Sequence, residues 1–325
     1  MYLDLSNDWF YPASFWKMQL HLLLQGKLAL AWMDKIAVST ESIMQRGSAA
    51  AVGGVAFFNP GATNIVYAYK SFSQEWSELQ PCCQHHSFTL IAINGLLTAV
   101  GGSQEKDTPG RTLLSFSEGN WKEVFPPMSV QRSSPAAACV GQSVLVAGGC
   151  RQDLLAIEIM NSNTLQWCTA SISLPVCSEA TLSLAAMVAC GDDLYGIFGD
   201  DRTHIYACSS SAVLQSYINI EDDKESVSSQ EIDVCIWRRI SDAPVSQSTA
   251  VAMCGWLISV GGCDDSKEVD TVCCYDPRTD SWSELGSLIS PKSLPLATTL
   301  PGNQLVVVHD NYDRTFIGTA TIVES

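Results

Sequence analysis

Leu257-Ile258-Ser259-Val260-Gly261-Gly262 is a short apolar run that closes on two consecutive glycines. The pattern recurs at Leu97-Thr98-Ala99-Val100-Gly101-Gly102 and at Val144-Leu145-Val146-Ala147-Gly148-Gly149. A second apolar run precedes each of the three, joined to it by a turn sequence: Cys254-Gly255, Asn94-Gly95 and Gly141-Gln142, respectively. Asn-Gly between two β-rich runs is a strong hairpin signal because both residues tolerate a positive φ. These stretches therefore predict β-hairpins that end in a di-glycine.

The hairpin turns divide the chain into six units. Gly53-Gly54 lies between two apolar runs, so it is a hairpin turn and not a di-glycine. Three units depart from the di-glycine and carry Pro60-Gly61, Gly199-Asp200 and Val308-His309 in its place. Four of the five steps between hairpin glycines span 41 to 50 residues, a period that indicates a repeat architecture. The hairpin glycines are Gly54, Gly95, Gly141, Gly191, Gly255 and Gly302.

One tryptophan accompanies each unit, 18 to 24 residues before its hairpin glycine: Trp32, Trp76, Trp121, Trp167, Trp237 and Trp282. Three of them follow an aromatic residue: Tyr69, Phe116 and Tyr275. Two hairpins per unit with a di-glycine, an aromatic residue and a tryptophan resemble the kelch motif, whose family forms β-propellers. The resemblance covers about residues 29–323. It implies an all-β fold, a six-bladed kelch-type propeller with four antiparallel strands per blade.

In such a propeller the di-glycines and the tryptophans are the structural positions of the repeat. Each tryptophan is expected to pack against the next blade. The glycines are expected to relieve crowding beside the central channel. The structural glycines are Gly101, Gly102, Gly148, Gly149, Gly261 and Gly262.

The two ends of the chain are expected to meet in one blade. The last unit ends without a tryptophan of its own, whereas Trp32 has no hairpin ahead of it. We therefore expect residues 28–32 to form the outermost strand of the last blade, which would cover an open sheet edge. Residues 1–27 then form an N-terminal tail or appended segment ahead of a propeller domain of residues 28–325.

The long step from Gly191 to Gly255 indicates an insertion at about residues 209–233, within the fourth blade. It contains Glu221-Asp222-Asp223-Lys224-Glu225, a composition that predicts a flexible acidic surface loop on the face opposite the functional one. Its serines beside acidic residues are candidate phosphorylation sites, and a tolerated surface insertion is the simpler interpretation.

Composition argues against several classes of partner. The net charge of −16 opposes binding to nucleic acid and to anionic membranes, which depend on basic patches. The 13 cysteines include no C-x-x-C, which favours a reducing, cytoplasmic location over a disulfide framework. We predict no signal peptide and no membrane span, and a propeller that is monomeric.

Function is expected at one mouth of the ring. Alternating strand directions bring the segments that lead into the first strands to the same face as the segments that follow the di-glycines. The first set supplies Arg46, His85, His86, Arg132, Ser133, Ser246 and Lys292, and the second supplies Arg151, Arg202 and Tyr312. Arginine and serine suit a carboxylate through charge-assisted hydrogen bonds, so a protein or peptide partner with an acidic segment is expected. The alternative is that these residues are solvated, or that the arginines brace neighbouring loops.

The resemblance supports this choice of face. Kelch proteins that recruit partners often use these loops, with Arg and Ser at positions that Arg46 and Arg132 match. Such propellers serve as scaffolds or as substrate adaptors of ubiquitin ligases behind BTB and BACK regions. The residues ahead of this propeller are too few to contain those regions.

The alternative function is a propeller enzyme. A copper oxidoreductase needs a histidine pair, but His85 and His86 are adjacent and would point to opposite faces of a strand. A carbohydrate-active hydrolase of the sialidase type carries S-x-D-x-G-x-x-W boxes, and none occurs. The vicinal pairs Cys82-Cys83 and Cys273-Cys274 fit buried side chains better than a redox site. The sequence therefore predicts a non-catalytic interaction module that needs no cofactor and no metal.

Overall fold

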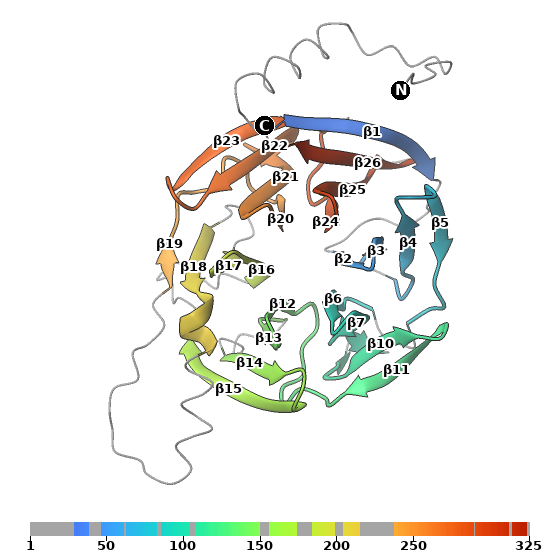
Figure 1. The fold of residues 1–325 in the computed structure, drawn as a ribbon, viewed down its shortest axis with the longest axis vertical. Helices are drawn as coiled ribbons and strands as arrows, with labels where there is room; N and C mark the ends of the chain where they lie inside the picture. Colours follow the sequence, from blue (N-terminus) through green and yellow to red (C-terminus); the bar gives the residue numbers. More distant parts are fainter. Residues whose placement is uncertain are drawn as a thin grey trace, which may run out of the picture.

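The computed structural model describes residues 29–38, 47–61, 63–82, 86–104, 108–149, 156–173, 184–198, 204–214, 237–288, 290–311 and 314–323. These residues form six four-stranded antiparallel sheets, one two-stranded ribbon and a short helix at 210–214. The sheets stand around a central axis in the order of the sequence (Figure 1). The expectation of an all-β propeller with four-stranded antiparallel blades is confirmed.

The sheets are named blade 1 to blade 6 in chain order. Blade 1 contains β2 (Ser48–Val52), β3 (Val55–Asn59), β4 (Tyr67–Lys70) and β5 (Glu75–Glu78), and blade 2 contains β6 (Thr89–Ile93), β7 (Leu96–Val100), β10 (Leu113–Ser117) and β11 (Asn120–Phe125). Blade 3 contains β12 (Ala136–Val140), β13 (Ser143–Ala147), β14 (Ala156–Asn161) and β15 (Gln166–Ser173). Blade 4 contains β16 (Leu184–Cys190), β17 (Asp193–Phe198), β18 (His204–Ser209) and β19 (Arg238–Arg239).

Blade 5 contains β20 (Thr249–Met253), β21 (Trp256–Asp264), β22 (Lys267–Asp276) and β23 (Ser281–Ser287). Blade 6 contains β24 (Leu296–Leu300), β25 (Gln304–Asn311), β26 (Arg314–Val323) and β1 (Ala29–Val38). The ribbon of β8 (Ser103–Gln104) and β9 (Thr108–Pro109) follows the di-glycine of blade 2.

Burial decreases from the axis to the rim of each blade. Every residue of β13 is buried, because both faces of an inner strand contact neighbouring blades. In β11, an outer strand, four of the six residues are exposed. The inner strands therefore read as continuous apolar runs, whereas the outer strands carry the charged residues.

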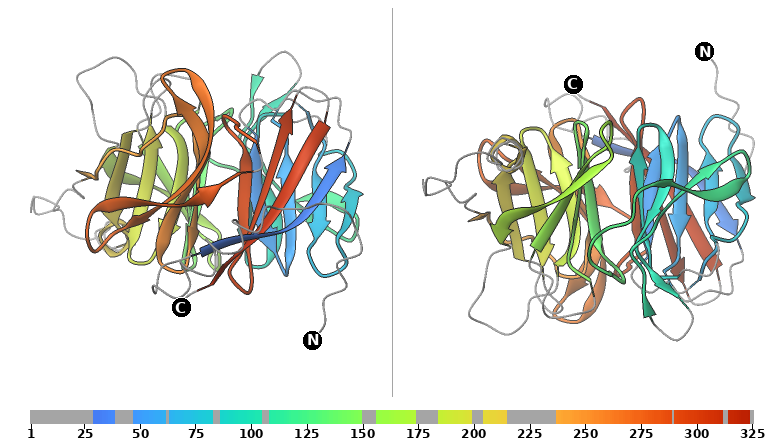
Figure 2. Two further views of the ribbon diagram at one scale, coloured as in Figure 1. Left: turned by 90° about the horizontal axis from the view of Figure 1, so that it is seen from above. Right: turned by 90° about the horizontal axis from the view of Figure 1, so that it is seen from below.

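Ring closure occurs through the N-terminal strand. β1 pairs antiparallel with β26, from Ala29 opposite Val323 to Val38 opposite Thr315, with an irregularity between Trp32 and Asp34 (Figure 2). The predicted pairing of the two ends is confirmed, and the strand is longer than expected. Residues 1–28 lie outside the described residues, as does the side chain of Trp32.

The tryptophans of the outer strands face the preceding blade, so the expectation that they pack against the next blade is wrong. Trp121 donates from Nε1 to the carbonyl of Gln80, and Trp167 donates to the carbonyl of Pro126, over 2.8 and 2.9 Å. Trp282 makes the same bond to Ser241 over 3.0 Å. Trp76 and Trp237 are the exceptions among the described tryptophans of the repeat, because their buried Nε1 atoms have no hydrogen-bond partner.

The aromatic residue of the third strand contacts the tryptophan of the fourth in three blades. The ring centroids lie 4.9 Å apart for Tyr69 and Trp76, and 5.3 Å apart for Tyr275 and Trp282. Phe116 contacts Trp121 edge-on at 5.3 Å.

The di-glycines are required where the loop of the following blade approaches. Gly101 and Gly261 have φ of +64° and +58°. A Cβ on Gly101 would lie 2.6 Å from the carbonyl oxygen of Arg132, and one on Gly261 would lie 2.4 Å from that of Lys292. The glycines therefore make room for the neighbouring blade, rather than for the channel itself.

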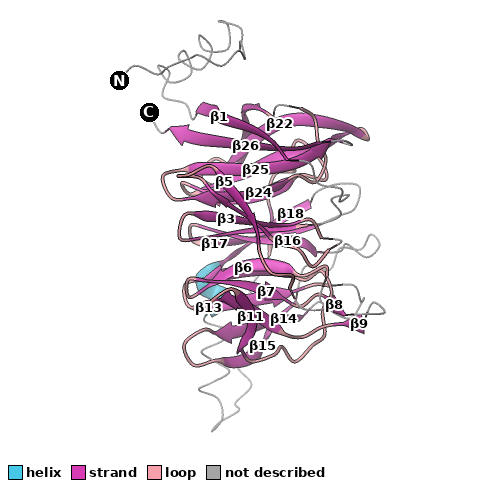
Figure 3. Ribbon diagram, turned by 90° about the vertical axis from the view of Figure 1, so that its right-hand side faces the viewer, coloured by secondary structure: helices cyan, strands magenta, loops and turns pink. Residues whose placement is uncertain are grey.

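The two faces of the ring carry different additions. The β8–β9 ribbon projects from the face that holds the lead-in segments, and the helix at 210–214 lies at the opposite face (Figure 3). This helix follows Ser209, which pairs with Asp193 beside the hairpin turn of blade 4. The acidic insertion thus begins on the face expected for it, and residues 215–236 lie outside the described residues.

The described cysteines agree with the expected reduced state except at one position. Cys208 is disulfide-bonded, so the expectation of reduced cysteines is wrong at this position. Free thiols occur at Cys82, Cys139, Cys168, Cys190, Cys254, Cys263, Cys273 and Cys274. Among the described helical residues, none forms a helix long and apolar enough to cross a membrane.

Candidate partner-binding mouth

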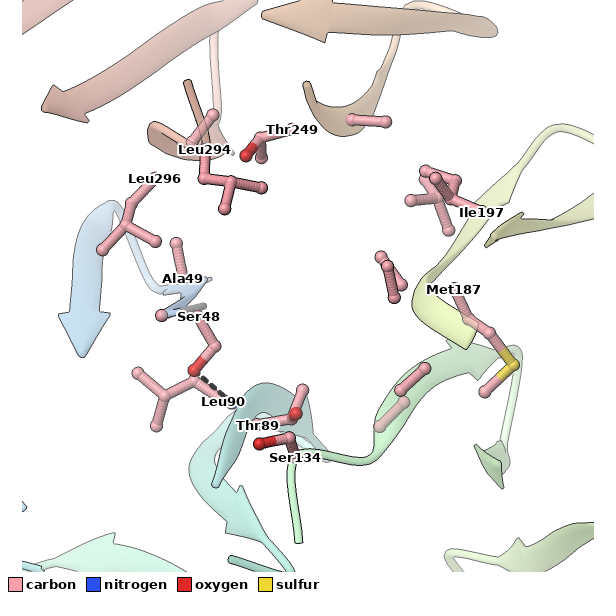
Figure 4. A pocket seen from close by; sticks show the side chains of 18 of the residues that line it. Ser48, Ala49, Thr89, Leu90, Ser134, Met187, Ile197, Thr249, Leu294 and Leu296 are labelled. Carbon is pink, nitrogen blue, oxygen red and sulfur yellow. Dashed lines mark hydrogen bonds between the residues drawn. The ribbon is translucent and has the colours of Figure 1, made fainter. Parts of the chain in front are cut away.

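The lead-in ends of the six first strands surround a cavity of about 600 Å³ on the axis of the ring (Figure 4). Each blade contributes one segment to its wall, and Ile197 of β17 completes it. The segments are 47–49, 88–90, 134–137, 184–188, 247–250 and 294–297. We call this opening the mouth.

Backbone hydrogen bonds bring the lead-in segments and the segments after the di-glycines together at the mouth. His86 and Ser103 exchange two bonds, with N–H to oxygen distances of 3.0 and 2.6 Å. Ser246 and Cys263 exchange two more, of 2.9 and 2.7 Å. The prediction that these two sets share a face is confirmed for blades 2 and 5.

Four lead-in segments hold a non-glycine residue in the left-handed region, two residues before the first strand. These residues are Ser87, Ser134, Gln247 and Leu294, with φ between 49° and 56°. The N–H of Ser134 donates to Ser87 O, and that of Leu294 donates to Gln247 O, so neighbouring blades fix these turns. Leu294 is the apolar member of the set, and its side chain is 37% exposed beside the cavity (Figure 4).

Arg132 does not offer its charge to the mouth, so its predicted role in partner binding is wrong. Its side chain is fully buried between blades 2 and 3, where Nε lies 3.0 Å from Glu158 Oε2. Nη1 donates to the carbonyl of Gly148 over 2.8 Å. The neighbouring Ser133 is buried as well. The alternative that an arginine braces adjacent loops applies here, because the guanidinium is held by groups of blade 3.

The other described candidates are partly exposed and already paired within the protein. Lys292 Nζ lies 3.7 Å from Glu268 Oε1, which also accepts hydrogen bonds from the N–H and hydroxyl of Ser293. Burial acts to raise the pKa of Glu268, but the Ser293 hydrogen bonds and the Lys292 ammonium outweigh it and lower the pKa. Ser246 donates to Cys263 O over 3.1 Å, and His86 Nδ1 lies 3.4 Å from Ser87 Oγ.

The remaining candidates lie outside the described residues: Arg46, His85, Arg151, Arg202 and Tyr312. A basic mouth therefore stays a prediction that rests on those residues alone.

Three hydroxyl residues outside the predicted set of binding residues line the cavity. Ser48, Thr89 and Thr249 each begin the first strand of a blade. Ser48 donates to Phe88 O over 3.1 Å, Thr89 donates to Pro135 O, and Thr249 donates to Pro295 O. Each hydroxyl thus donates to a carbonyl of the adjoining blade. The first strand that carries it is the innermost of its blade, so its inner edge has no partner strand. A hydroxyl at the same position of three units was the signal in the sequence.

Among the described residues, we find no metal-binding or reactive thiol cluster at the mouth. Within these ranges, no three histidine, cysteine or carboxylate side chains gather in a way that could hold a metal ion. Burial raises the pKa of Cys273 to about 11, and burial also raises that of Cys274. Cys83 lies outside the described residues, so the other vicinal pair is untested.

Comparison with known proteins agrees with this architecture. A family model of the Kelch motif matches residues 244–289, which contain blade 5. An F-box/kelch-repeat protein of Arabidopsis thaliana is 31% identical over 77 residues, which make up 24% of this chain and 20% of the relative. The match thus spans about a fifth of that relative's length.

The solved structure of YjhT superimposes with a TM-score of 0.61 over 88% of this chain and 96% of that one. At 11% identity this likeness shows the fold alone. The comparisons thus show similarity to a Kelch motif in blade 5, to a kelch-repeat protein over about a quarter of this chain, and to the fold of one solved structure.

Proposed function

We propose that this chain is a non-catalytic protein-interaction module, a six-bladed kelch propeller that binds a segment of a partner at the mouth. The observation that carries the proposal is the wall of the cavity, whose described residues offer hydroxyl, amide and apolar groups. No carboxylate, imidazole, thiol or ammonium group occurs among those described lining residues. General acid–base and nucleophilic catalysis depend on such groups, whereas partner binding does not.

The kelch-repeat relatives support an interaction role in general terms. They assign no partner to this chain, since the matched segment is a small part of the curated relative.

Leu294 provides a test with a matched control. Leu165, in the β14–β15 turn on the opposite face, is also a leucine at positive φ, with φ of 60° against 49° and exposure of 42% against 37%. Aspartate is tolerated in this conformation, so Leu294→Asp and Leu165→Asp should both fold. We expect affinity capture with the full chain to lose its bound proteins with Leu294→Asp and to retain them with Leu165→Asp.

Equal capture by both variants would contradict the assignment of the mouth, as would losses confined to Leu165→Asp. Metal analysis of the purified chain checks the enzyme alternative separately. Stoichiometric copper would overturn a non-catalytic role.

A further inference from the structure

Building on the proposed function, we infer that the mouth takes an uncharged segment of a protein partner. In this segment a hydrogen-bond-donating side chain (Asn, Gln, Ser or Thr) stands beside an apolar one. The acidic segment expected from the sequence is the competing ligand. The juxtaposition behind the inference is that hydroxyls of blades 1, 2 and 5 alternate around the cavity with apolar side chains of blades 4 and 6 (Figure 4).

Three hydroxyls of the cavity can act only as hydrogen-bond acceptors for a ligand, because their protons are donated within the protein. A serine or threonine hydroxyl has one proton and two lone pairs. Ser48, Thr89 and Thr249 each donate that proton to a carbonyl of the adjoining blade. Ser48 Oγ also accepts from the N–H of Leu90 over 3.1 Å, so one of its two lone pairs is already used. The lone pairs that remain on the three hydroxyls match an N–H or O–H donor.

A carboxylate does not match these three hydroxyls. It carries only acceptors, and losing its hydration without a donor or a cation is costly. The described cations near the mouth are already used, since Arg132 is buried against Glu158 and Lys292 lies beside Glu268. The net charge of −16 also repels an acidic partner at long range.

Apolar side chains supply the other kind of contact in the proposed site. Met187 and Ile197 lie across the cavity from Ser48 and Thr89 (Figure 4). Leu294 and Leu296 of blade 6 line the cavity between Thr249 of blade 5 and Ser48 of blade 1, and Leu294 is exposed (Figure 4). A cavity of about 600 Å³ holds a few side chains and not a folded element. A short loop that presents one donor and one apolar side chain would match a hydroxyl and the apolar side chain beside it.

The probe is a random peptide-loop library displayed on phage, selected on the full chain and counter-selected on the Leu294→Asp variant. We expect the surviving loops to be enriched in uncharged donor residues next to an apolar residue. Replacing the donor Asn by the isosteric Asp in a synthetic loop should weaken binding at least about tenfold. Affinity should change little between low and high salt, since no ion pair forms.

Thr89→Val keeps the shape of the side chain and removes the acceptor, so it should weaken the same loop. The melting temperature of Thr89→Val reports whether the hydrogen bond from Thr89 to Pro135 is needed for folding. The Asn→Asp change is made in the synthetic loop and measured on the unmodified chain, so it does not depend on that result. The opposite result would be selected loops that depend on Leu294 but are rich in Asp or Glu, and that bind less tightly after Asp→Asn or in high salt. That result would overturn this inference and leave the proposed function standing. Absence of any loop that depends on Leu294 would overturn both.

Discussion

Arg132 and Glu158 form an ion pair inside the molecule, with Nε 3.0 Å from Oε2 and side chains that are 0% and 1% exposed. Glu158 lies on β14 and also accepts hydrogen bonds from the N–H and hydroxyl of Ser129 and from the N–H of Val130. The backbone of Arg132 bonds to Gly102 and Gly110 of blade 2. The carboxylate thus ties the lead-in segment of blade 3 to β14, and backbone hydrogen bonds tie the same segment to blade 2.

Breaking this pair should destabilise the propeller strongly. Arg132→Met leaves the Glu158 carboxylate buried without its counter-ion, for which a loss of about 3–5 kcal/mol is expected. Denaturant unfolding measures the change. Lys122→Met is the control, because its ion pair with Glu118 is exposed and its removal should leave stability nearly unchanged. The double variant Arg132→Met/Glu158→Leu should recover much of the loss, and failure to do so would contradict a role based on the buried charge.

The di-glycine should be sensitive to a single methyl group. Gly261→Ala places a Cβ 2.4 Å from Lys292 O, whereas Gly255 also has a positive φ but has no atom within 4 Å of its Cβ position. Both variants carry the cost of a left-handed alanine, so their difference isolates the clash. We expect Gly261→Ala to lose about 1–3 kcal/mol more stability than Gly255→Ala. Equal losses would mean that conformational freedom alone selects glycine.

The tryptophan hydrogen bonds should be measurable one at a time. Trp167→Phe removes a bond of 2.9 Å to Pro126 O, whereas Trp76 has no partner for its Nε1. Both replacements remove a similar ring area. Trp167→Phe should therefore cost about 0.5–1.5 kcal/mol more than Trp76→Phe in thermal or denaturant unfolding. The opposite order would contradict the inter-blade bond.

Closure by β1 predicts a strong length dependence at the N-terminus. Removing residues 1–38 deletes β1 and leaves β26 as an uncovered edge, so the melting temperature should fall and aggregation should increase. Removing residues 1–20 leaves β1 intact and should change the melting temperature little. Equal melting temperatures for the two truncations would contradict closure.

The acidic insertion should be dispensable for folding. Excision of residues 219–230 spares the helix at 210–214 and the pairing of β18 with β19. We expect the melting temperature to stay nearly unchanged, because a charged loop of this composition contributes few buried contacts. Loss of folded protein on excision would show that the loop packs as part of blade 4.

Local sequence patterns were sufficient for the repeat and for its closure. The apolar runs around Asn94-Gly95 and Cys254-Gly255 became hairpins, since turn geometry and period-2 burial depend on neighbouring residues. Trp32 precedes the first hairpin, and the last unit has only three strands of its own. Because such a unit leaves an open sheet edge, the sequence predicted the pairing of β1 with β26.

Only the tertiary structure decided how each side chain at the mouth is used. Arg132 and Arg46 look alike in the sequence, yet Arg132 is buried because blade 3 places Glu158 beside it. The hydroxyls of Ser48, Thr89 and Thr249 donate their protons within the protein because an adjoining blade presents a carbonyl to each. The tryptophans face the preceding blade for the same kind of reason. A repeat pattern specifies the strands of one blade, whereas the charge state, donor direction and burial of a residue depend on groups that the ring brings in from a distant part of the chain.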